Sequence, residues 1–248
     1  MKARKVEKLK PARSLDENAA RTIRVRLEEL RSFAPAALEV DNSREQHDMR
    51  IAAKRLRYVL EATEFCFGKP GQTARRRARD LQDVLGELHD CDVMLPRVEG
   101  HLAELRSGAA GEVRERAGDA DDVDPTLAAR TRHRTAYRGL EVLAVYLEAR
   151  RALLFDRFRD LWAAQERLGT WDALDRAATR VLREAKERRK AARRAEAAER
   201  ELIEAERIRR EAAERVRAAA AELAQAQGPT RLSGPGNLGV GGTSETQS

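Results

Sequence analysis

The chain has 248 residues, of which 37% are charged and only 4% are aromatic. A large β-sandwich or a broad doubly wound sheet would need more aromatic and β-branched residues, whereas the abundant Ala, Arg, Glu and Leu favour long helices. We therefore predict an all-α protein. Its 49 Lys and Arg against 42 Asp and Glu give a net charge of +7, which suits a polyanionic partner without proving one.

The cysteine content and the apolar segments indicate a cytoplasmic location. Cys66 and Cys91 are too few for a disulfide framework, and no apolar stretch follows the basic first residues to form a secretory signal. The most apolar segment, residues 140–147, is far shorter than the roughly 18 residues that a membrane-spanning helix needs. We expect a soluble, cytoplasmic protein.

The first helix is expected to follow a flexible basic N-terminus, residues 1–13. Ser14 and Glu17 have the spacing of a capping box, in which each side chain bonds to the other residue's free backbone N–H. Pro35 should interrupt or end this helix. The apolar stripe that would pack into a core consists of Ala20, Ile23, Leu27 and Leu30.

Three more helices are predicted before a linker. A second helix covers about residues 43–67, a third runs from about 72 to 94 and ends before Pro96, and a short fourth covers 97–106. The next segment, residues 107–125, combines small residues with an acidic cluster, which is typical of a solvated connection.

Helical periodicity resumes after the linker. Residues 126–167 predict one long helix or two, followed by a shorter helix near 171–183, so that a helical bundle would cover 14–183. Residues 184–227 are mostly Ala, Arg, Lys and Glu. Their few large apolar residues do not sustain a heptad, so a solvated helix with Glu–Arg pairs is favoured over a coiled coil. Residues 228–248 are Gly-rich and should be disordered.

The second helix has one apolar face and one basic face. On a wheel of 100° per residue, the core face comprises Met49, Ala52, Ala53, Leu56, Val59, Leu60, Thr63 and Phe67. The other side carries His47, Arg50, Lys54, Arg57 and Glu61. A chain of phosphates could follow this row of cations. A solvated face on which Arg57 pairs with Glu61 is the alternative.

The third helix repeats this division. Its apolar side comprises Ala74, Ala78, Leu81, Val84, Leu85, Leu88 and Leu95, and its other side comprises Arg75, Arg79, Gln82, Gly86 and His89. A tight turn through residues 68–71 would make the two helices antiparallel neighbours, with both basic sides along one groove. Arg75 and Arg79 would then lie nearer Arg57, and His89 nearer His47.

Two motifs on these helices resemble a known family. HDMRIAAKRLRYVLE at 47–61, followed by LQDVLGELHDCDVML at 81–95, is similar to the CHAD domain, the conserved histidine α-helical domain. The order of the motifs and the distance between them fit the family, and a weaker resemblance extends over about 15–183. Members of that family are helical bundles that bind inorganic polyphosphate and can be directed to polyphosphate granules.

The resemblance implies a set of phosphate contacts. They are His47, Arg50, Lys54, Arg55 and Arg57 on the second helix and Arg75, Arg79 and His89 on the third, with Arg21 and Arg24 as weaker candidates. Arg can form a bidentate contact with phosphate oxygens, Lys supplies a mobile charge, and His becomes cationic when a nearby anion raises its proton affinity.

The sequence departs from the family in one respect. A full CHAD domain resembles two related helical halves, whereas this chain contains the motif once. Residues 133–142 begin with His but lack the second basic run. The chain would therefore either dimerise to complete the site or bind weakly on an open groove, and we favour the homodimer.

Other functions have less support. His47 and Asp48, as adjacent helical residues, point about 100° apart and cannot easily share a metal ion. No phosphate loop, nucleophile elbow or cofactor motif indicates an enzyme. Nucleic acid is the stronger competitor, but only Tyr58 lies near the basic rows as a stacking platform. The C-terminal helix as a scaffold is a further alternative.

Overall fold

The computed structural model describes residues 2–226 and 228, and among them it contains helices and no strands. The α-helices are α1 (Leu15–Ala37), α2 (Ser43–Thr63), α3 (Lys69–Ala117), α4 (Pro125–Ala129), α5 (Arg134–Arg167) and α6 (Thr170–Ala226), with a 3-10 turn, η1 (Glu64–Cys66), after α2. The prediction of an all-α protein is confirmed. The chain divides into two units, Met1–Arg188 and Arg189–Ser248.

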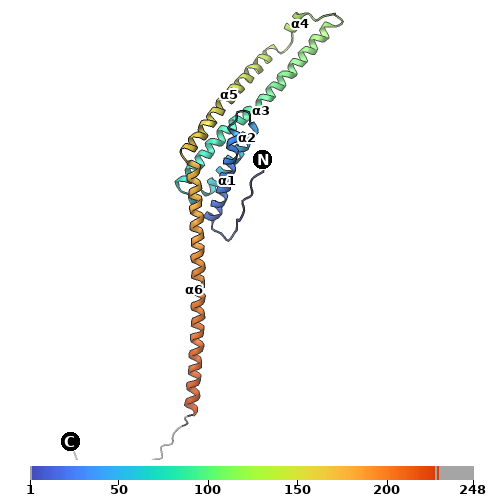
Figure 1. Ribbon diagram of the computed structural model, residues 1–248. Coiled ribbons are helices and arrows are strands. Elements are labelled where there is room, and N and C mark those ends of the chain that lie inside the picture. The colour runs from blue at the N-terminus through green and yellow to red at the C-terminus, as the bar shows by residue number, and fades with distance from the viewer. Residues whose placement is uncertain (1, 227, 229–248) are drawn as a thin grey trace, which may run out of the picture. The chain divides into compact units, whose positions relative to one another are not determined.

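The first unit is a helical bundle in which α2 lies between α1 and α3, and α5 runs along α3 (Figure 1). The predicted apolar faces of α2 and α3 form much of its core. All the residues named for those faces are buried except Val59 and Leu95, which are partly buried against the core. Cys91 is buried and Cys66 is partly buried, and both are free thiols.

The start and the end of α1 differ from the prediction. The Ser14 side chain makes no capping bond, and the backbone N–H of Glu17 donates instead to Asp16 Oδ1 at 2.9 Å. The Glu17 carboxylate pairs with Arg13 and Arg21, so the capping box is wrong. The helix also continues past Pro35 to Ala37, a buried residue whose burial helps to hold the last turn.

The predicted break at Pro96 is wrong, because α3 is continuous from Lys69 to Ala117 with Pro96 inside it. The separate helix at 97–106 and the beginning of the linker at 107 are therefore wrong too. Contacts with α5 explain why the helix continues: Tyr137 Oη donates to the Leu105 carbonyl at 2.6 Å, and Arg106 pairs with Glu141 at 2.8 Å. The irregular connection is limited to residues 118–124.

The last two helices meet at Gly169, which has a φ of +61° that favours glycine. Trp162 of α5 stacks on Trp171 of α6 with ring centroids 6.0 Å apart. The shorter helix predicted at 171–183 and the charged helix predicted at 184–227 are parts of one helix, α6.

In the second unit, residues 189–226 are exposed along their whole length. Ion pairs of the predicted Glu–Arg kind occur there, with Arg207 bonded to Glu204 and Glu211, and Arg210 to Glu214. The predicted disordered tail lies outside the described residues except for Gly228. None of the helices in the described part of the chain is long and apolar enough to cross a lipid bilayer.

Candidate anion-binding groove

The candidate site lies where α2 and α3 run side by side in opposite directions. The chain reverses between them at Gly68, which has a φ of +62°. The rings of His47 and His89 lie against each other, with centroids 4.2 Å apart and planes at 46°. This contact confirms the predicted antiparallel register, in which His89 was expected near the His47 end of α2.

A groove of about 340 Å³ lies between the same two helices, and neither histidine is among its lining residues. Its lining comprises Arg50 and Lys54 from α2 and Gln82, Asp83, Gly86, Glu87 and Asp90 from α3. Arg50 packs over Gly86, where an added Cβ would lie 3.9 Å from Arg50 Nε, an ordinary van der Waals contact.

Several polar atoms on the basic side of α2 are shielded from solvent and have no hydrogen-bond partner within the described chain. They include His47 Nδ1, Arg50 Nε and Arg57 Nε on α2 and Gln82 Oε1 on α3. A buried donor or acceptor without a partner costs roughly 1–3 kcal/mol. An anionic oxygen beside Arg50 could accept from its Nε–H and recover that cost, and one beside His47 could accept from Nδ1 when that nitrogen carries a proton.

The environment of His47 holds its side chain in the neutral form. Burial lowers the pKa of His47 below its ordinary value, and the neighbouring charges of His89 and Arg50 lower it further, while Asp48 opposes them. A phosphate beside the ring would reverse this balance, because an adjacent anion favours the charged imidazolium.

The carboxylates of the groove are mostly engaged by arginines. Arg150 of α5, which the sequence analysis missed, donates to Glu87 at 2.6 Å, and Arg79 lies 3.7 Å from Asp83. Asp90 is exposed. With Glu87 and Asp83 paired to arginines, the other charges along the groove are those of Arg50, Lys54 and Asp90.

The sequence analysis also missed Arg151, which connects α5 to α3 and to the start of α2. Its Nε donates to Asp92 at 2.5 Å, and its Nη2 donates to the Gln46 side chain at 3.3 Å, beside His47. The adjacent arginines at 150 and 151 were visible in the sequence. Their placement against α3 depends on how α5 packs, which the local pattern does not reveal.

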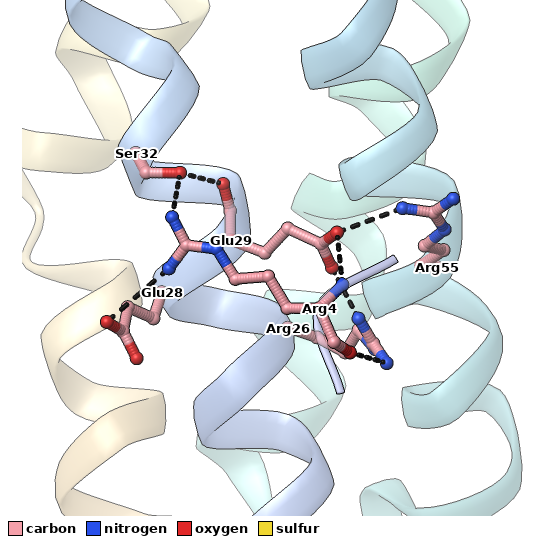
Figure 2. Close-up of polar contacts among 6 residues, drawn as sticks. All are labelled: Arg4, Arg26, Glu28, Glu29, Ser32 and Arg55. Carbon is pink, nitrogen blue, oxygen red and sulfur yellow. Dashed lines mark hydrogen bonds and ion pairs between the residues drawn. The ribbon is translucent and has the colours of Figure 1, made fainter. Parts of the chain in front are cut away.

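The structure does not bring Arg55 into the groove. Its guanidinium faces α1 and donates to Glu29 at 2.9 Å (Figure 2). Glu29 is fully buried and also accepts from Arg26 at 2.5 Å and from the backbone N–H of Arg4 at 3.2 Å. Arg55 therefore belongs to a polar cluster that joins α1, α2 and the N-terminal segment.

Arg57 and Arg75, which were also predicted to contact phosphate, do not line the groove. Arg57 lies 4.7 Å from the centroid of the Tyr58 ring and 3.7 Å from Glu61, the pair that the alternative interpretation expected. Arg75 is bonded to Glu64 of η1. The atom of Arg57 nearest to Glu61 is Nε, which makes no hydrogen bond, and Arg57 follows Lys54 by three residues along the basic side of α2.

The two weaker candidates lie in a different hollow, of about 580 Å³, between the N-terminal segment, α1 and α6. Arg21 pairs with Glu17 at 3.0 Å, and Arg24 pairs with Asp175 at 3.0 Å. Arg31, in the same hollow, bonds to Asp172. Arg24 and Arg31 thus connect α1 to α6, whereas the Arg21 pair lies within α1.

No group of three or more His, Cys, Asp or Glu side chains is arranged to hold a metal ion within residues 2–226. The groove thus combines two cations of α2, Arg50 and Lys54, with polar and acidic side chains of α3, in an all-α protein whose second helix has a basic face. Residues 2–99 match the family model described as CHAD domain, which confirms the resemblance for α1, α2 and the first part of α3.

The CHAD domain is associated in general with polyphosphate binding or metabolism. The matched stretch ends inside α3, so the weaker resemblance expected as far as residue 183 lies beyond it. No curated protein and no solved structure shows a significant match to the chain.

Proposed function

We propose that the protein binds inorganic polyphosphate, without cleaving it, along the face of α2 that borders the groove. The observation that carries this proposal is the row of cations on α2: Arg50, whose Nε–H has no hydrogen-bond partner among the described residues, and Lys54 line the groove, and His47 lies three residues before Arg50. Anionic oxygens are the partners that such donors require.

The spacing of the cations suits a linear polyanion. His47, Arg50, Lys54 and Arg57 follow one another at three or four residues, so they lie on one side of the helix and span about 15 Å at 1.5 Å per residue. Arg50 can give two parallel bonds to one phosphate, and Lys54 can follow the chain as a mobile charge. Several consecutive phosphate units would be held at once.

Binding rather than hydrolysis is proposed because two of the three carboxylates that line the groove already have arginine partners. Glu87 accepts from Arg150, and Asp83 lies beside Arg79. Phosphoryl transfer depends on groups that stabilise the charge of the transferring phosphoryl and position the attacking nucleophile. The groove offers cations to hold phosphates and no free pair of acidic groups to activate water.

The test is a calorimetric titration of the full chain with long-chain polyphosphate at low and high salt. Single-stranded RNA of equal phosphate content serves as the competing polyanion. We expect binding to polyphosphate that weakens steeply with salt, because cations that contact a polyanion release its counterions. Equal affinity for RNA would contradict the proposal, as would the absence of binding to polyphosphate.

Two double variants locate the binding surface. Arg50→Ala with Lys54→Ala removes two cations from the groove, whereas Arg207→Ala with Arg210→Ala removes two exposed cations from the second unit. Both reduce the net charge by two. We expect the first to weaken binding at least tenfold and the second to change it by less than twofold. Equal losses would mean that net charge alone attracts the polymer.

We further propose that this binding directs the protein to polyphosphate granules. A fluorescent fusion of the full chain should co-localise with granules in cells that accumulate polyphosphate, and the variant lacking Arg50 and Lys54 side chains should be diffuse. Co-localisation of that variant would assign the targeting to another surface.

A further inference from the structure

An apolar stripe on α5 faces solvent in the first unit. Large side chains there are more than half exposed: Val142 (62%), Val145 (65%), Tyr146 (56%) and Leu153 (62%). Together with the exposed Ala149, they fall within an arc of about 100° on a helical wheel. The opposite side of α5 supplies Leu147, Leu154 and Phe158 to the core. α5 therefore has a second apolar face, which no other part of the described chain covers.

Charged residues of opposite sign lie at the two ends of this stripe and on the same arc. Arg138 precedes it, and Asp160 follows it, and both are exposed. Each lies eleven residues from Ala149, about 16 Å at 1.5 Å per residue. The face thus runs from Arg138 through the apolar residues to Asp156, which lies on the same arc and pairs with Arg159, and then to Asp160, with Ala149 midway between Arg138 and Asp160.

We propose that this face is the contact surface of a homodimer in which two copies of α5 pack antiparallel about a two-fold axis at Ala149. In this arrangement Val145 lies opposite Leu153 of the partner subunit, four residues on either side of the axis. Arg138 lies opposite Asp160 of the partner subunit at both ends. Such a surface is self-complementary, as a two-fold interface requires.

A parallel pairing would place Arg138 beside Arg138 of the partner subunit and Asp160 beside Asp160 of the partner subunit, and like charges repel. Of the charged residues that flank the stripe, Glu141 pairs with Arg106 and Arg150 pairs with Glu87. The small side chain at Ala149 also lets the two helices approach closely where they cross.

The expected assembly is a reversible dimer. A single helical face about 33 Å long from Arg138 to Asp160 buries less surface than most stable complexes, so the dissociation constant should be on the order of micromolar. Sedimentation velocity of the full chain should show a particle of twice 27.9 kDa that dissociates on dilution. A monomer at all concentrations up to about 100-fold above that range would overturn the proposal.

Matched substitutions separate this face from the exposed helix of the second unit. Leu153→Glu should abolish the dimer, whereas Leu202→Glu, at a position that is 61% exposed, should leave it intact. Both positions are exposed, so far-UV circular dichroism should be unchanged. Dissociation by the change at Leu202 and not by the change at Leu153 would assign the interface to residues 189–226 and overturn the proposal.

A charge exchange tests the antiparallel register. Arg138→Asp or Asp160→Arg alone should weaken the dimer about fivefold or more, because each places like charges together at both ends. The double exchange should restore most of the lost affinity. Failure of the rescue would rule out the pairing of these two residues.

Cross-linking tests the two-fold axis directly. Ala149→Cys should form an intermolecular disulfide on mild oxidation, because the two copies of this position meet at the axis. Val142→Cys should not, because in the antiparallel register it lies seven residues from the axis. Cross-linking of both variants would indicate a parallel dimer, and cross-linking of neither would place the contact elsewhere; each result contradicts the proposal. The unaltered chain is the control for disulfides formed through its own cysteines, Cys66 and Cys91.

Discussion

Arg151 of α5 donates its Nε–H to Asp92 of α3 at 2.5 Å, and both side chains are more than four-fifths buried. The two residues are 59 positions apart in the chain, and their pair joins α5 to α3. The same guanidinium reaches Gln46 and the Val40 carbonyl, so one side chain connects α5 to α3 and to the start of α2.

We therefore expect Arg151→Met to lower the free energy of unfolding by about 2–4 kcal/mol, because it leaves the Asp92 carboxylate largely buried without its cation. Urea denaturation followed by circular dichroism measures the change. Arg159→Met, which removes an exposed pair with Asp156, should cost less than about 1 kcal/mol. Similar costs at the two positions would show that the Arg151–Asp92 pair contributes no more than a surface pair.

Glu29 should be a second strong determinant of stability. Glu29→Gln removes the negative charge that Arg26 and Arg55 share in a fully buried position, so we expect a loss of about 3–5 kcal/mol. Glu28→Gln is the control, because that neighbouring carboxylate is 76% exposed and pairs only with Arg4 among the described residues. Equal and small effects on thermal unfolding would contradict the structural role assigned to Glu29.

The lowered pKa of His47 predicts a pH dependence of stability. Because the imidazole binds a proton less readily in the folded than in the unfolded chain, its contribution is fully present above pH 6.5. It is lost progressively as pH falls from there toward the folded pKa. His47→Gln should flatten this part of the stability profile, measured by urea unfolding between pH 5 and 8. His101→Gln, at an exposed position, should leave the profile unchanged.

Two glycines of α3 should respond oppositely to alanine. At Gly71 an added Cβ would lie 2.7 Å from the Glu64 carbonyl oxygen and 3.0 Å from Phe67 Cβ, so Gly71→Ala should destabilise the protein by about 1–3 kcal/mol. At Gly100 nothing lies within 4 Å, and Gly100→Ala should stabilise it by about 0.5–1 kcal/mol. Thermal unfolding measures the change in stability of each variant. A change in the same direction for both variants would contradict the close approach at Gly71.

Periodicity predicted the parts of the fold that depend on one helix at a time. The apolar sides of α2 and α3 were correct nearly residue by residue, and the short turn at Gly68 correctly implied that His47 and His89 are neighbours. Proline was misleading in both places, because the rule that it ends a helix neglects the packing that holds α1 past Pro35 and α3 past Pro96.

The candidate site was harder to predict because it depends on which helix each side chain faces. Arg55 follows Lys54 directly in the chain but lies about 100° away around the helix, and it points to Glu29 on α1. Arg150 reaches Glu87 from 63 residues away. Neither partner is marked by any short-range pattern, so only the packing of α1 and α5 reveals it.

Because α3 is one continuous helix, the directions in which the side chains of its two halves point are fixed relative to each other. Its first half borders the groove, and Leu105 and Arg106 further along contact α5. One residue inserted at Gly100 would rotate everything beyond it by about 100°, whereas four residues would rotate it by only about 40°. Insertions or deletions within α3 should therefore be tolerated best when they add or remove about one whole helical turn.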